Sequence, residues 1–256
     1  MNLITGRCIW ITGASSGLGG ALAEQLATAG NFVIASARSH SALTELALRY
    51  PGKIKALPID VSSKMDLKNT ENKIREITDY VDMVICAAGI CEYEDNLSFN
   101  PDVYERTLDV NFLGVVRVLK IALPLLKKAQ SRPHFIAISS LSSCIGLPRA
   151  EAYGASKAAL NYFMESLRVD LSHIDIDLSV VRPGFIATNL TKQNDFAMPL
   201  MMTPEVAARR IIREVAHRKF LIDFPRRLSW ALRLCKFFFP VWSAWIAPRI
   251  TRIHQW

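Results

Sequence analysis

A short apolar segment, residues 9–12, leads directly into a turn with glycines at positions 13, 17 and 19, after which apolar residues recur at helical spacing. This order of strand, glycine-rich turn and helix is typical of a dinucleotide-binding unit. Gly13 permits a tight turn, Gly17 lets the backbone approach a pyrophosphate, and Gly19 lets the helix pack closely, while the helix N-terminus favours an anion. The pattern predicts cofactor contacts from Gly13, Ser15, Ser16, Gly17, Leu18 and Gly19. The alternative is an ordinary strand-to-helix turn that holds three glycines by chance.

Apolar runs of strand length alternate with helical patterns along the chain. The runs cover residues 8–12, 32–35, 83–86, 135–139, 177–181 and 220–224, and helical patterns such as residues 19–29 and 104–128 lie between some of them. This alternation predicts an α/β fold, a single Rossmann-type doubly wound domain whose parallel sheet has helices on both faces. No linker-like stretch divides the chain. We therefore expect one domain over residues 1–225 and an amphipathic helical tail over residues 226–256.

Composition and charge exclude several classes of protein. With 256 residues, 50% hydrophobic and 21% charged, the chain has the composition of a folded domain rather than a disordered, collagen-like or disulfide-rich protein. The net charge is +8, and residues 218–256 hold eight basic side chains against the single acid Asp223. Because this basic segment is crowded with Trp and Phe rather than polar phosphate-binding residues, no nucleic-acid partner is expected.

The cysteines and the N-terminus bear on location. The chain has five cysteines, an odd number without a C-x-x-C pair, which predicts neither a zinc site nor a redox dithiol; no metal is expected. Unpaired thiols fit a reducing compartment. Residues 1–7 are too short and too polar for a secretory signal. We therefore expect a cytoplasmic protein.

The segment after the second expected strand bears on the choice between NAD and NADP. NAD-binding folds carry an acid there that holds the ribose 2′-hydroxyl. This chain instead has Ser36-Ala37-Arg38-Ser39. Arg38 offers a planar cation for a 2′-phosphate, and Ser39 or Ser15 can donate hydrogen bonds. These residues predict NADP(H) in preference to NAD(H), the alternative being that Arg38 is a solvated loop residue.

A tyrosine and a lysine have the spacing of an acid–base pair. In Tyr153-Gly154-Ala155-Ser156-Lys157 the two side chains lie four residues apart, so they share one face of a helix. A neighbouring ammonium stabilises phenolate and is expected to lower the tyrosine pKa from its usual value of about 10. Proton exchange with an alcohol or carbonyl oxygen then becomes feasible near neutral pH.

Together, the glycine turn and this pair make the chain resemble the short-chain dehydrogenase/reductase family over residues 6 to about 225. The resemblance implies hydride transfer between NADP(H) and a carbonyl or secondary alcohol. It implies that Tyr153 gives the oxygen its proton while Ser140 holds that oxygen. It also implies that Lys157 hydrogen-bonds the nicotinamide ribose.

Two further catalytic positions come from the same resemblance. The family's serine precedes its tyrosine by thirteen residues, which implies Ser140, although Ser139, Ser142 and Ser143 lie close enough to compete. Asn111 matches the asparagine that completes the family's tetrad through a bound water. The alternative for Asn111 is a residue that bends a helix.

The resemblance also covers positions around the cofactor. It implies adenine contacts at Asp60 and Val61, close backbone approach at Ala88 and Gly89, and nicotinamide contacts at Pro183, Gly184 and Thr188, besides those of Tyr153 and Lys157. One position departs from the family, since its usual Asn-Asn-Ala-Gly is Cys86-Ala87-Ala88-Gly89 here. We expect this turn to lose some rigidity but to keep cofactor binding.

The substrate has a weaker signature. Residues 185–202 are apolar and hold three methionines, which predicts an apolar or lipid-like carbonyl or alcohol. The alternative is that Met198, Met201 and Met202 cover the core. The competing class of function is a non-catalytic NADP(H)-binding sensor, or a membrane-associated scaffold that retains the fold. The complete tetrad favours an enzyme.

The tail combines aromatic residues with cations. Arg233, Lys236 and Pro240 interrupt its apolar stretch, which argues against a membrane-spanning helix. An interfacial helix on anionic lipid fits better and predicts peripheral membrane contact through residues 226–256, at the cytoplasmic face of a membrane. The alternatives are a cap over the substrate pocket and contact with another subunit.

The helix that carries Tyr153 also has an apolar, small-residue face. Its residues are Ala158, Ala159, Tyr162, Phe163, Ser166 and Leu167. With the family resemblance this face predicts a homodimer or homotetramer, although ordinary core packing also explains it.

Overall fold

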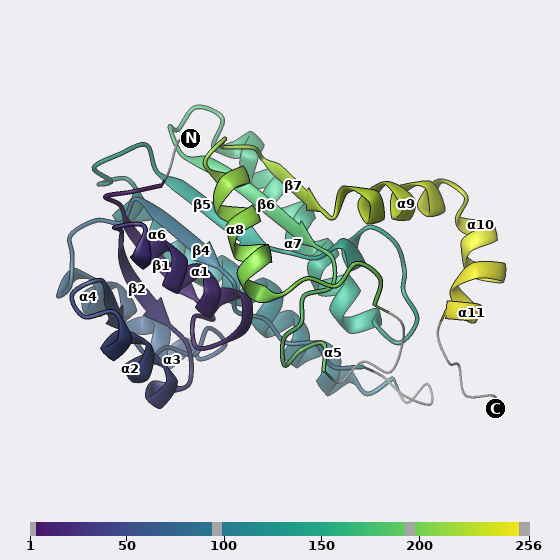
Figure 1. Ribbon diagram of the computed structural model, residues 1–256, viewed down its shortest axis with the longest axis horizontal. Helices are drawn as coiled ribbons and strands as arrows, with labels where there is room; N and C mark the ends of the chain where they lie inside the picture. Colours follow the sequence, from purple (N-terminus) through teal and green to yellow (C-terminus); the bar gives the residue numbers. More distant parts are fainter. Residues whose placement is uncertain (1–3, 94–98, 193–197, 251–256) are drawn as a thin grey trace.

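The computed structural model describes residues 4–93, 99–192 and 198–250, which fold around a seven-stranded sheet (Figure 1). Neighbouring strands are parallel throughout, in the order β3-β2-β1-β4-β5-β6-β7. The strands are β1 (Cys8–Thr12), β2 (Phe32–Ser36), β3 (Ile54–Ala56), β4 (Met83–Cys86), β5 (His134–Ile138), β6 (Asp177–Pro183) and β7 (Leu221–Phe224). The α/β class and the doubly wound parallel sheet are confirmed.

Helices connect the strands and cover both faces of the sheet (Figure 1). Before β7 they are α1 (Gly17–Thr28), α2 (His40–Arg49), α3 (Lys64–Lys68), α4 (Thr70–Arg75), α5 (Pro101–Leu108), the π-helical turn η1 (Asp109–Leu113), α6 (Gly114–Leu126), the 3-10 turn η2 (Leu141–Ser143), α7 (Glu151–Asp170) and α8 (Pro204–Val215). The tail after β7 consists of α9 (Arg226–Phe237), α10 (Phe239–Val241), the π-helical turn η3 (Trp242–Ile246) and α11 (Ala247–Ile250).

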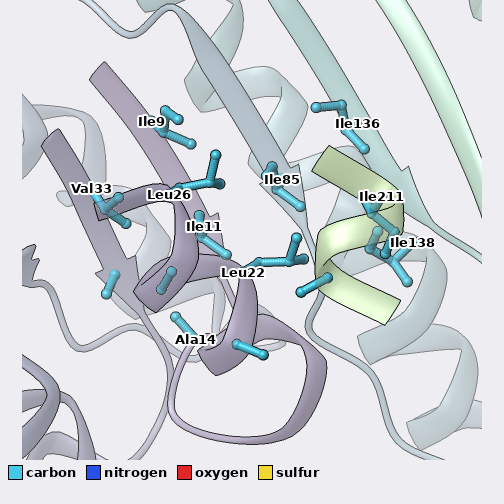
Figure 2. Close-up of a cluster of buried hydrophobic side chains, with 14 of the residues drawn as sticks. Ile9, Ile11, Ala14, Leu22, Leu26, Val33, Ile85, Ile136, Ile138 and Ile211 are labelled. Carbon is cyan, nitrogen blue, oxygen red and sulfur yellow. The ribbon is translucent and has the colours of Figure 1, made fainter. Parts of the chain in front are cut away.

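Alternate residues of β1 pack into two separate hydrophobic layers. Ile9 and Ile11 lie with Leu22 of α1 and Ile211 of α8 on one face of the sheet (Figure 2). Trp10 points to the opposite face, into the layer formed with α6 and α7. Because both faces are covered, a slip of one residue would exchange the two layers, so burial fixes the register of the strand.

The strand order reverses beside β1, and this reversal determines where along the sheet a ligand crevice can form. From β1 the chain builds the sheet outward through β2 and β3, then returns to pair β4 on the other side. Thr12 at the end of β1 lies opposite both Ser36 of β2 and Cys86 of β4. In open parallel sheets a ligand crevice forms outside the carboxyl ends of the strands at such a reversal.

The helical pattern predicted over residues 104–128 is not one continuous α-helix. An α-helical segment ends at Leu108, the π-helical turn η1 follows, and α6 begins at Gly114. Buried Asn111 lies in the π turn, which accommodates an extra residue without ending the helix. The predicted helical pattern is therefore helical as far as Leu126, and it contains a π turn at Asn111.

The tail is helical, as predicted, and leaves the sheet at β7 to reach the margin of the molecule (Figure 1). Asp223 of β7 ties its base to the domain, because this carboxylate accepts hydrogen bonds from Arg182 of β6 and from Ser229 and Arg233 of α9. Within the described ranges, no helix is both long and apolar enough to cross a membrane. Residues 251–256 of the predicted extension lie outside the described residues.

Candidate active site

A cleft of about 820 Å³ opens at the carboxyl ends of the central strands. Every residue predicted to bind the cofactor lines it, and so does Ser140. The lining residues that the sequence predicted are Gly13, Ser15, Ser16, Gly17, Leu18, Gly19, Arg38, Ser39, Asp60, Val61, Ala88, Gly89, Ser140, Tyr153, Lys157, Pro183, Gly184 and Thr188. Segments that are far apart in sequence are thus brought to one cleft.

The glycine turn is built so that side chains cannot fill it. Gly13 has a φ of +74°, and a Cβ there would lie 2.6 Å from the backbone nitrogen of Ala88. A Cβ on Gly19 would collide with the carbonyl oxygen of Gly13, and one on Gly17 would lie 3.1 Å from Cγ2 of Thr188. The turn therefore leaves bare backbone beside the start of α1, a cradle that fits a pyrophosphate.

Arg38 and Ser39 lie at the end of the cleft next to β2. Arg38 is exposed and lines the cleft. The Ser39 hydroxyl accepts a hydrogen bond from the Ala42 backbone and so caps α2. Ser36, the last residue of β2, is buried and accepts a hydrogen bond from Trp10 Nε1. Arg38 is therefore the charged side chain that follows β2 into the cleft.

The structure separates Ser140 from its three competitors. Ser140 precedes η2, and its hydroxyl is hydrogen-bonded to the hydroxyl of Tyr153. Ser139 is buried and donates to the backbone oxygen of Lys157, while Ser143 donates to the backbone oxygen of Ser140. The Ser142 hydroxyl is buried with no partner among the described residues. Of the four serines, Ser140 is the one brought to Tyr153.

Lys157 is buried beneath Tyr153. Its Nζ donates a 2.9 Å hydrogen bond to the backbone oxygen of Ile138 and lies 5.8 Å from the centroid of the Tyr153 ring. Burial lowers the pKa of Lys157 to about 8, against an opposing influence of Cys91 and Cys86. The side chain is 4% exposed, so this ammonium is held in a poorly solvated position.

The prediction that Lys157 lowers the pKa of Tyr153 is wrong. Burial of the hydroxyl raises the pKa of Tyr153 above its ordinary value, Cys91 adds to the rise, and the hydrogen bond with Ser140 opposes it. The tyrosine as a whole is partly exposed, but its hydroxyl end is desolvated. The phenol is therefore protonated near neutral pH.

Asn111 lies behind the cleft and does not line it. Its Oδ1 accepts a 2.8 Å hydrogen bond from the Ile90 backbone, and its Nδ2 donates to Ile90 O at 2.9 Å and to Ser156 Oγ at 3.0 Å. The Ser156 hydroxyl in turn donates to the backbone oxygen of Tyr153. The side chain of Asn111 therefore joins the segment after β4 to the helix that carries Tyr153.

We expect Asn111→Ala to lower the free energy of unfolding by about 2 kcal/mol. The substitution removes three hydrogen bonds and leaves the polar groups of Ile90 to partial hydration, since Ile90 is only half-buried. Urea unfolding measures this loss, and Asn100→Ala, which removes only an exposed helix cap, serves as the control. Equal losses in the two variants would contradict the joining role of Asn111.

Comparison with known families agrees with this geometry. The sequence profile of the family described as short chain dehydrogenase matches residues 7–198. The chain belongs to the short-chain dehydrogenase family. An uncharacterized oxidoreductase from Myxococcus xanthus is 32% identical over 236 residues, which cover 90% of this chain and 92% of that relative.

Two solved members share the fold of this short-chain dehydrogenase. A protein from Burkholderia phymatum in complex with NAD has a TM-score of 0.84 at 20% identity. The superposition covers 94% of this chain and 96% of that protein's chain. A protein from Burkholderia cenocepacia in complex with NADP has a TM-score of 0.82 at 20% identity. Here the superposition covers 96% of this chain and 100% of that protein's chain. At this identity the likeness establishes the Rossmann-like fold.

Several residues of the site were not identified from the sequence, and three of them have a clear place in it. Cys91 lines the cleft beside Tyr153, Ile90 is held by Asn111, and Ser156 joins Asn111 to α7. Cys91 and Ile90 directly follow the predicted Ala88-Gly89 turn, so their place along the chain was an available signal. No local pattern in the sequence indicated Ser156, because its role depends on a contact with a residue 45 positions earlier.

Proposed function

We propose that this chain is an NADP(H)-dependent oxidoreductase that interconverts a carbonyl and a secondary alcohol. The observation that carries this proposal is the convergence of Ser140, Tyr153 and Lys157 on the cleft that holds the glycine turn. A bound nicotinamide would supply or accept the hydride. The catalytic unit is residues 1–225, and residues 226–256 form an extension. The sensor alternative does not explain why an acid, its partner and a buried lysine share the cofactor cleft.

The side chains of the site are suited to proton exchange at the oxygen of the substrate. Near neutral pH the phenol of Tyr153 carries its proton, so it has one to give to a carbonyl oxygen in the reductive direction. Ser140, hydrogen-bonded to that phenol, would hold the same oxygen. Lys157 would contact the ribose of the nicotinamide from beneath the ring of Tyr153. Asn111 would position the segment after β4, and with it the water that replenishes the proton.

NADP(H) is the proposed cofactor in preference to NAD(H), because an arginine lies where an acid would contact the ribose. We expect Arg38→Asp to weaken NADPH binding by about 10- to 100-fold, the contribution of hydrogen bonds to a charged group, while NADH binding is kept or improved. Fluorescence titration with both cofactors measures the change. Lys53→Asp makes the same charge change at an exposed residue outside the cleft. Equal losses for both cofactors in Arg38→Asp would contradict the assignment.

The proposed substrate is apolar or lipid-like. Beyond the cofactor residues the cleft lining includes the apolar side chains of Ile90, Val110, Ile186 and Leu190, which support this proposal, together with the polar side chains of Glu92, Asn189 and Thr191. In the methionine-rich segment, Met202 pairs with Ile186 and packs on the core, which matches the alternative that it covers the core. Met201 is exposed and does not line the cleft, and residues 196 and 197 lie outside the described residues.

We further propose a homo-oligomer and a peripheral location. Of the face predicted from the sequence, Ala158, Tyr162 and Ser166 are exposed on α7, which supports a subunit contact there. The exposed aromatic and basic residues of the tail support peripheral contact with the cytoplasmic face of a membrane. The cysteines within the described residues are free thiols, in keeping with a reducing compartment.

A further inference from the structure

Helix α9 of the tail has two apolar faces with different surroundings. Leu228, Leu232 and Cys235, at spacings of four and three, are turned toward the body of the protein and are partly buried. Trp230 and Phe237, seven residues apart on the opposite side, are 71% and 80% exposed. A soluble helix normally buries one apolar face and hydrates the other. The second apolar face of α9 is therefore unusual.

Exposed apolar residues are also found beyond α9, and the same tail carries cations. We call the exposed apolar residues of the tail the outer face, and define it by Trp230, Leu234, Phe237, Phe238, Phe239 and Trp245. The tail also contributes Arg226, Arg227, Lys236 and Arg249, and no acidic residue follows Asp223 in the sequence. A large exposed apolar patch marks an interaction site, and aromatic residues beside cations suit the headgroup region of an anionic bilayer.

The charge of the outer face favours lipid over a second copy of this chain. Two outer faces brought together would set cations against cations, with no carboxylate in either tail to compensate. A bilayer of anionic phospholipid supplies the missing negative charge and an apolar medium for the aromatic rings.

The inner side of the tail is attached to the segment that connects the two catalytic residues Ser140 and Tyr153. Trp242 is 5% exposed, packs against Ile145 and Ala247, and donates its Nε1 hydrogen to the backbone oxygen of Gly146 at 2.9 Å. The segment 144–150 links η2, which follows Ser140, to α7, which carries Tyr153. The contact with Trp242 therefore holds the loop that connects the two catalytic residues.

The base of the tail touches a residue that lines the cleft. A Cβ placed on Gly184 would lie 3.0 Å from Pro225 and 3.1 Å from Leu228, so α9 packs directly on this cleft residue. The Asp223 network fixes the same base to β6 through Arg182. The tail thus contacts both Gly184, which lines the cleft, and Gly146, which lies in the segment between Ser140 and Tyr153.

We propose that the outer face docks on anionic phospholipid and that docking regulates the active site through the contact between Trp242 and Gly146. The proposal rests on the oxidoreductase site assigned above and adds its partner and its regulation. A tail held by lipid holds segment 144–150 more firmly, since the free tail can leave the loop whenever its small hydrophobic contact opens. Docking also brings the cleft to the membrane surface, where an apolar substrate is concentrated.

Vesicle binding tests the surface. The full-length protein is expected to sediment with phosphatidylcholine vesicles that contain phosphatidylglycerol, and far less with phosphatidylcholine alone. Phe237→Glu should weaken this partitioning by about 10-fold or more, because it removes an aromatic ring from the lipid and adds a negative charge. The matched control is Leu48→Glu, which changes a leucine that is 75% exposed on α2. Failure of the wild-type protein to bind, or equal losses in both variants, would overturn the proposal.

Hydrogen exchange tests the coupling to the site. Vesicles with phosphatidylglycerol should slow exchange of the amides in segment 144–150 of the wild-type protein by about two- to tenfold, the range that one neutral hydrogen bond contributes. Trp242→Phe keeps an aromatic ring but lacks the donor to Gly146. This variant should still bind the vesicles while its loop exchange no longer responds to them.

Other outcomes distinguish lipid docking, its coupling to the active site and the proposed enzyme activity from one another. Vesicle binding without a change in loop exchange would overturn the coupling. A concentration-dependent dimer that Phe237→Glu abolishes would assign the outer face to a second copy and overturn lipid docking. Because neither readout requires turnover, a protein that binds lipid and responds in the loop but reduces no carbonyl would count against the proposed enzyme alone.

Discussion

Tyr153→Phe is expected to lower kcat for carbonyl reduction by about 10²- to 10⁴-fold, the range that a positioned general acid contributes. The substitution removes the only atom that joins Tyr153 to Ser140 by a side-chain hydrogen bond and leaves the ring over Lys157 in place. NADPH affinity should therefore change little. Steady-state turnover and a cofactor titration on the same protein measure the two quantities.

The chain offers a matched control for this substitution. Tyr162 lies on the same helix α7, is 77% exposed and is outside the cleft. Tyr162→Phe should keep the turnover of the wild-type protein. If Tyr153→Phe also kept it, another group would be the proton donor and the assignment of Tyr153 would be wrong.

Lys157→Met is expected to abolish turnover and to change how stability depends on pH. The pKa of Lys157 is lowered from 10.5 to about 8 by burial, so the unfolded chain binds a proton more tightly than the folded protein. Between about pH 8 and 10.5 the unfolded state is the more protonated one, and the free energy of unfolding must rise with pH through this window. At about 1.36 kcal/mol per pKa unit the rise is about 3 kcal/mol.

Urea unfolding at several pH values through this window measures the effect. Other lysines, tyrosines and cysteines also titrate there, so the quantity of interest is the difference between the wild-type protein and Lys157→Met. That difference should shift in favour of the wild-type protein as the pH rises. A pH-independent difference would mean that Lys157 is not desolvated in the folded protein.

The parts of the fold that local sequence determines were predictable. The run at β1, its glycine turn and α1 depend on neighbouring residues, and the structure places them as predicted. Strand β3 was not among the predicted runs, because Ile54-Lys55-Ala56 is short and has a lysine exposed at the edge of the sheet. The cofactor residues also gather as expected, since strand ends of a parallel sheet share one edge.

Features that depend on distant contacts were not predictable. The π turn at Asn111 is accompanied by hydrogen bonds to Ile90, 21 residues earlier, while the pattern of apolar residues around it is that of a regular helix. The sequence of the tail does not indicate where the tail attaches to the domain, because Trp242 donates its hydrogen bond to a backbone oxygen 96 residues earlier in the chain. The sequence spacing likewise placed Lys157 near Tyr153 but carried no information on burial. Burial determines the direction in which the pKa of Tyr153 is shifted.

NADPH oxidation by the full-length protein, followed as loss of nicotinamide absorbance, tests the proposed reaction most directly. The substrates should be apolar ketones, aldehydes, 3-oxoacyl thioesters and steroid-like carbonyls, with Tyr153→Phe as the inactive reference. We expect oxidation of NADPH that depends on one of these carbonyls, with an equal amount of alcohol formed and little activity in the variant. Tight binding of NADPH without reduction of any carbonyl, or without oxidation of the matching alcohols by NADP⁺, would contradict the enzyme and favour a cofactor-binding sensor.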